Sequence, residues 1–140
     1  MYRTEIHDTI TSALRQIPEI LHIGLWNENI QFINQEQPWQ RPAVFIEFLP
    51  ADWTAPSKEP GILTADTQIR LHIVTDAITA TLDNRTELSS DITAALCCTH
   101  GNYFTRIRLA QNATNHNHDE VIEDIDTYTI KVYKTIRQTI

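Results

Sequence analysis

The chain has 140 residues and a net charge of −7, with 18 acidic and 11 basic side chains. A length of this order predicts one domain, residues 1–140, with a core that needs no disulfide or metal to hold it. The acidic balance argues against direct nucleic-acid binding, because gripping phosphates needs clustered Lys and Arg.

The sequence also indicates where the protein resides. No stretch approaches the roughly 18 apolar residues of a membrane span, and the opening MYRTEIHDTI has no apolar signal region. Cys97 and Cys98 are adjacent, a spacing that disfavours a disulfide and suits a reducing compartment. We expect a soluble cytoplasmic protein without membrane contact.

The first half of the chain predicts one helix and two strands. Residues 2–17 place apolar side chains on one helical stripe, and Pro18 ends the helix. The stripe consists of Tyr2, Ile6, Ile10, Leu14 and Ile17. A short strand follows within residues 20–26. Residues 43–49 are apolar on both faces, which is typical of a central strand covered on both sides.

The middle of the chain predicts a strand and a second helix. Residues 67–76 alternate, so Ile69, Leu71 and Ile73 face inward while Gln68, Arg70 and His72 face outward. In the helix that follows, Asn84 is the expected N-cap, with Glu87 completing a capping box, and Gly101 is the expected C-terminal cap. The buried stripe of this helix is expected to be Leu88, Ile92, Ala95 and Leu96.

Two further strands are predicted around a polar turn, one within residues 103–113 and one within 121–136. In the second strand the apolar parity changes between Ile125 and Tyr128, so we expect a bulge near Asp126. The element order α-β-β-β-α-β-β predicts an α+β domain, with two main helices packed on an antiparallel or mixed sheet.

The turn itself carries the main candidate chemistry, with His116, His118 and Asp119 within four positions. Two imidazoles and a carboxylate could supply three zinc ligands, and a small metal-dependent enzyme is the alternative interpretation. The cluster lacks an HExxH motif or a cysteine pair, and Asn, Asp and His are common turn residues. We therefore favour a hairpin tip, with no metal and no cofactor.

Other catalytic patterns are weak. Glu123 and Asp124 face opposite sides of their strand, and Asp124 and Asp126 are expected on its polar, solvent-facing side. With three glycines in the chain, no phosphate-binding loop or nucleophile elbow is present. The sequence predicts no enzyme.

Two proline-framed tryptophans remain, Trp39 in QPWQRP and Trp53 in PADWTAP. Tryptophan is enriched at interface hot spots, so both are candidate subunit-interface residues. The alternative is that each folds back over its own domain, and a further alternative is an adaptor that binds another protein through these loops without self-assembly.

The order of these stretches resembles the tail completion proteins of long-tailed phages and prophages, a group that includes tail terminators, minor tail proteins and head–tail joining proteins. The resemblance rests on IPEILHIGLWNENI, RPAVFIEFLPADW, IRLHIVTD and the hairpin NHNHDEVIEDIDTYTIKVY. It spans nearly the whole chain, and PAVFIEF before a tryptophan-bearing loop is its most specific part.

The resemblance implies an α+β structural subunit with no catalytic residues. Copies would form a homo-oligomeric ring, expected to be a hexamer, that caps the tail tube and meets head–tail connector proteins. The protein would assemble in the bacterial cytoplasm and reside in the virion tail. The negative charge would then keep the DNA passage free by repelling phosphates.

Overall fold

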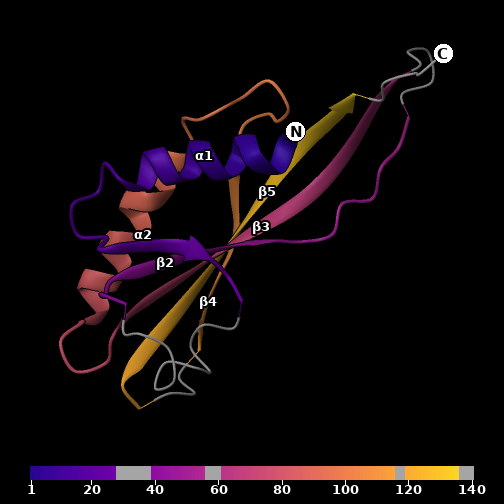
Figure 1. Cartoon of the computed structure of the whole chain (residues 1–140). Coiled ribbons are helices and arrows are strands. Elements are labelled where there is room, and N and C mark those ends of the chain that lie inside the picture. Colours follow the sequence, from indigo (N-terminus) through magenta and orange to yellow (C-terminus); the bar gives the residue numbers. More distant parts are fainter. Residues whose placement is uncertain (28–38, 56–60, 116–118, 136–140) are drawn as a thin grey trace.

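A computed structural model describes residues 1–27, 39–55, 61–115 and 119–135. Across these residues, two helices and five strands follow one another in the predicted order, which confirms the α+β class (Figure 1). The elements are α1 (Tyr2–Leu14), β1 (His22–Leu25), β2 (Ala43–Phe48), β3 (Ile62–Asp76), α2 (Leu82–Leu96), β4 (Arg108–Asn115) and β5 (Val121–Thr135).

The five described strands form one mixed sheet in the order β1-β2-β3-β5-β4, in which β1 and β2 pair in parallel and the other pairs are antiparallel. β3 begins at Ile62, earlier than predicted, and pairs with β5 from Ile62 opposite Thr135 to Asp76 opposite Val121. The two long strands lie side by side, and the start of β3 and the end of β5 project together beyond the helices (Figure 1).

The bulge predicted near Asp126 is wrong. β5 keeps a continuous register with β3, and the irregularity lies in the neighbouring edge strand, between Leu109 and Gln111 of β4. β5 is held on both sides, whereas β4 has one neighbour and can absorb an extra residue at lower cost.

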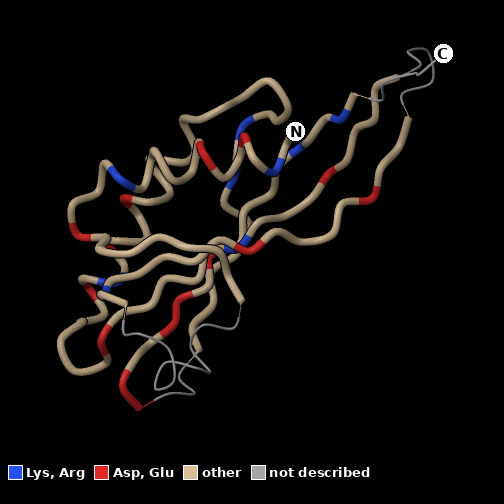
Figure 2. Tube along the Cα trace, viewed as in Figure 1, with Lys and Arg blue, Asp and Glu red and all other residues tan. Residues whose placement is uncertain are grey.

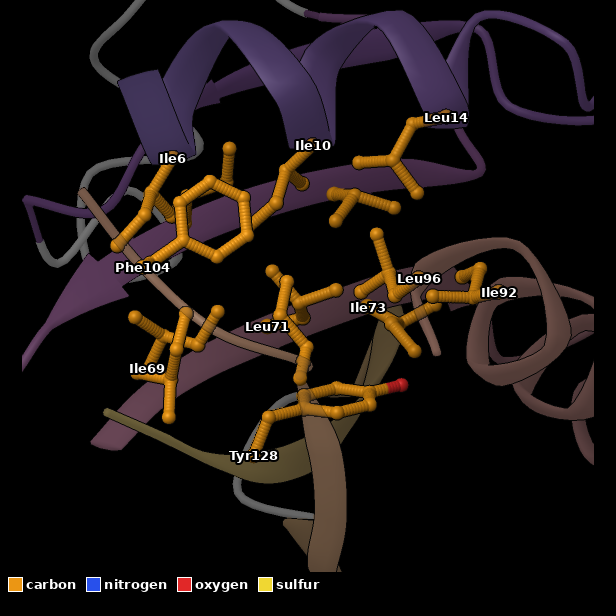
Figure 3. Close-up of a cluster of buried hydrophobic side chains, with 14 of the residues drawn as sticks. Ile6, Ile10, Leu14, Ile69, Leu71, Ile73, Ile92, Leu96, Phe104 and Tyr128 are labelled. Atoms are coloured by element: carbon orange, nitrogen blue, oxygen red, sulfur yellow. The ribbon is translucent and has the colours of Figure 1, made fainter. Parts of the chain in front are cut away.

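Both helices pack on one face of the sheet, where they enclose the main core (Figure 3). The predicted inward residues of β3, Ile69, Leu71 and Ile73, are at most 2% exposed. The helices contribute Ile6, Ile10 and Leu14 from α1 and Leu88, Ile92 and Leu96 from α2. The apolar periodicity therefore predicted this core correctly.

The helix ends differ from the expectation at three points. α1 ends at Leu14, before Pro18, as the chain tightens through a hydrogen bond from Ile17 N–H to the Leu14 carbonyl. Asn84 is not the N-cap of α2: the helix begins earlier, and the extended Thr81 accepts a hydrogen bond from the Asn84 N–H on its side chain. α2 ends at Leu96, before the cysteine pair.

Gly101 is not a helix cap. It lies beyond the end of α2, where a Cβ atom would stand 2.1 Å from the Glu5 Oε1 atom. The same carboxylate oxygen accepts a hydrogen bond from the Tyr103 N–H at 2.8 Å. Glycine at this position thus lets α1 approach the segment that leads into β4.

Candidate assembly surface

Trp39 lies over the face of the sheet that the helices leave free. Its ring meets that of Phe45 edge-on, with 5.0 Å between centroids. Together with Trp26 it packs against a small second core, formed by Ala43, Phe45, Val74 and Val121. β2 is therefore covered on both faces, as its sequence predicted.

Trp53 borders the main core on the other side of the molecule. It is half-buried, and its ring packs edge-on against Tyr2 at 5.3 Å between centroids. Both candidate interface tryptophans thus pack partly on their own domain. Their contact with another subunit stays a prediction, and each side chain also contributes to folding.

His72 departs most clearly from its prediction, which placed it in solvent. The imidazole is 5% exposed, with Nε2 at 2.8 Å from a Glu47 oxygen and Nδ1 hydrogen-bonded to Glu123. Trp26 stacks on the ring with 3.7 Å between centroids. Both ring nitrogens therefore have a carboxylate partner on a neighbouring strand.

This cluster joins three strands rather than forming a reactive centre. Glu47 lies on β2, His72 on β3 and Glu123 on β5, so the two contacts connect three neighbouring strands of the sheet. Trp26 covers the ring from outside the sheet. The sequence contains no local signal for the cluster, because its members are 25 and 51 residues apart along the chain.

A second set of polar contacts connects α2 to β5 as three rungs. Arg85 makes a two-pronged ion pair with Asp124 at 2.7 and 2.8 Å. The hydroxyl of Ser89 donates to Asp126 at 2.6 Å. The hydroxyls of Thr93 and Tyr128 lie 2.9 Å apart.

The sequence predicted that Asp124 and Asp126 lie on a solvent-facing strand surface, and these contacts show that this prediction is wrong. Asp124 and Asp126 face α2, and Asp126 is 1% exposed. Four residues of helix rise about 6 Å and two residues of strand about 6.6 Å, so spacings of four on α2 and two on β5 stay in register. We call these three contacts the α2–β5 ladder.

The ladder also perturbs two ionisable groups. Burial raises the pKa of Tyr128 far above its usual value, against the smaller opposing effect of the Thr93 hydrogen bond. The hydrogen bonds that Arg85 donates to Asp124 raise the pKa of Arg85. Both shifts stabilise the protonated forms that make the rungs, which suits a structural role rather than proton transfer.

The three residues of the alternative metal-site interpretation lie mostly outside the part of the chain that the structure describes. His116 and His118 lie outside the described residues, and Asp119 is exposed. Among the described residues, no group of three or more His, Cys, Asp and Glu side chains is arranged to hold a metal ion. Within the same residues, no helix is long and apolar enough to cross a membrane.

Comparison with known proteins gives a likeness of fold. The chain matches a solved structure described as the virion of a native gene transfer agent particle, with a TM-score of 0.59 and 11% identity. The match covers 91% of this chain and 93% of that one. No protein-family model matches the sequence, and no curated protein does.

Proposed function

We propose that this protein is a structural subunit of a phage-like particle, acting as a tail terminator or completion protein. The observation that carries the proposal is the fold likeness to a chain of a gene transfer agent virion, which spans more than nine-tenths of both chains. Because nearly all of each chain is matched, the likeness concerns a whole subunit rather than a shared fragment.

The polar clusters of the domain support a scaffold over an enzyme. The polar contacts around His72 and along the α2–β5 ladder hold strands and helices together. Each buried carboxylate named above already has its hydrogen-bond donor, so none is left as a free base beside an open cavity.

In this function, copies of the chain form a hexameric ring at the end of the tail tube and meet the head–tail connector. The test is electron microscopy of the purified protein over a wide concentration range, alone and with tail-tube protein. Rings alone or on tube ends support the proposal. A protein that stays monomeric and never binds tube ends contradicts it.

A matched pair of variants separates assembly from folding. Trp39→Phe and Trp53→Phe keep most of the packing of each ring against its own domain. If the tryptophans contact neighbouring subunits, these variants fold normally and form fewer rings. Unchanged assembly would show that neither tryptophan lies in the subunit interface, and it would not contradict the ring.

A further inference from the structure

The face of the sheet that the helices leave free carries a concentration of positive charge. A groove of about 870 Å³ crosses β3, β5 and the start of β4. We call it the cationic groove, after the four basic residues in its lining, Arg70, Arg106, Arg108 and Lys131. These are four of only eleven Lys and Arg residues in a chain of net charge −7.

Two of the four cations lie near an acidic side chain of the described domain, and the other two do not form an ion pair there. Arg70 lies 4.0 Å from Glu47, and Lys131 stands directly across from Asp66 in the sheet. Arg106 and Arg108 are exposed and form no ion pair with any of the described residues. Like charges placed together without counter-ions repel, so the groove is suited to an acidic partner.

The opposite charge gathers on the helical side of the molecule. A cleft of about 600 Å³ lies between α2, the segment after α1 and the start of β2. Its rim carries Glu19, Glu87 and Asp91, all exposed and without an ion-pair partner in the described part of the chain. The two other charged pairs there, formed by Arg41 and Arg85, are satisfied within the domain.

This acidic cleft has two features that folding alone does not explain. Glu87 and Asp91 are four residues apart on α2, a like-charge spacing that costs the helix about 0.2–0.5 kcal/mol. Thr75 is 3% exposed, and its hydroxyl in the cleft wall has no hydrogen-bond partner among the described residues. A guanidinium entering the cleft would supply donors to both the carboxylates and this hydroxyl.

We infer that the cationic groove of one copy docks on the acidic cleft of the next, an inference that rests on the proposed ring. The groove and the cleft lie on opposite faces of the sheet, so the groove of one molecule cannot contact the cleft of the same molecule. A contact between two different surfaces of identical chains is head-to-tail, and such contacts close into a ring when the rotation from copy to copy adds up to a full turn.

The charge distribution of the whole chain favours a second copy over nucleic acid as the occupant. Acidic positions lie along helices and strands alike (Figure 2), so an approaching phosphate backbone meets repulsion around the groove. Docking of copies also covers the exposed cations and leaves the assembled surface acidic, as a passage for DNA requires.

The test reverses each surface separately. Arg106→Glu with Arg108→Glu reverses the groove, and Glu87→Arg with Asp91→Arg reverses the cleft. All four positions are exposed, so the variants are expected to fold, as circular dichroism and thermal unfolding check. In each variant alone, the groove and the cleft that meet carry charges of the same sign. The protein concentration at which half of the chains are assembled is therefore expected to rise by more than about 100-fold.

Mixing the two variants is the decisive step. In an equimolar mixture every contact joins opposite charges again, so rings of alternating composition are expected to return. The control is Arg3→Glu with Lys134→Glu, which makes the same change of net charge outside the groove and should assemble as wild type.

The outcomes separate this inference from the proposed function. If wild type forms rings and the variants do so equally well, or if mixing restores nothing, the docking is wrong and the ring stands. If the groove variant assembles normally but loses binding to a DNA duplex, the groove binds the phosphate backbone of DNA and not a second copy of the chain. If wild type forms no ring alone or on tube ends, both proposals fail.

Discussion

The middle rung of the α2–β5 ladder allows a quantitative prediction. Asp126 is 1% exposed and accepts hydrogen bonds from Ser89 at 2.6 Å and from Asn112 at 2.7 Å. Ser89→Ala removes one of these donors and leaves a buried carboxylate oxygen without a partner. Loss of a hydrogen bond to a charged group should lower the free energy of unfolding by about 1.5–3 kcal/mol.

The assay is urea unfolding followed by tryptophan fluorescence, with Ser90→Ala as the matched control. Ser90 is the next residue on α2 and is exposed, so its variant should change stability by less than about 0.5 kcal/mol. If Ser89→Ala were no more destabilising than Ser90→Ala, the ladder would not hold α2 on β5, and the account of Asp126 would be refuted.

Three further predictions concern buried side chains. Because burial raises the pKa of Tyr128 above 10.0, the free energy of unfolding should fall by about 1.4 kcal/mol per pH unit as the pH rises beyond about 10. The Tyr128→Phe variant should lack this part of the loss. Parallel plots of unfolding free energy against pH for the two proteins would contradict this prediction. His72→Leu removes the imidazole that contacts the buried Glu123 carboxylate and should cost about 3–5 kcal/mol in urea unfolding. A cost below about 1 kcal/mol would show that this contact does not hold the strands together. Trp53→Ala should lower the melting temperature of the monomer and its free energy of unfolding by about 2 kcal/mol, because the ring packs on Tyr2. An unchanged melting temperature would show that Trp53 does not stabilise its own domain.

The sequence predicted what depends on local periodicity. The spacing of Ile6, Ile10 and Leu14 and the alternation of Ile69 and Leu71 identified the main core, because buried faces repeat at the helix and strand periods. These patterns also gave the element order and the fold class.

It did not predict the polar partners, which depend on tertiary packing. Asp126 and Tyr128 share a face of β5, and that face is covered by α2, so a polar residue there is buried rather than solvated. The only advance signal was the spacing of Arg85, Ser89 and Thr93 beside the apolar stripe of α2. Such a spacing is more often found on a solvent-exposed helix surface.

The cationic groove was hidden for a related reason. Arg70 and Lys131 are 61 positions apart and come together only because β3 pairs with β5, with Arg108 added from the neighbouring β4. Net charge reports a sum over the chain, and it does not reveal that the few cations are grouped.

Native mass spectrometry of the wild-type protein, from dilute solution to high concentration and with tail-tube protein, tests the central claim most directly. The account predicts a species of six times the 16.1 kDa chain mass that grows with concentration or on addition of the tube protein. A species at the mass of one chain under every condition would contradict the ring.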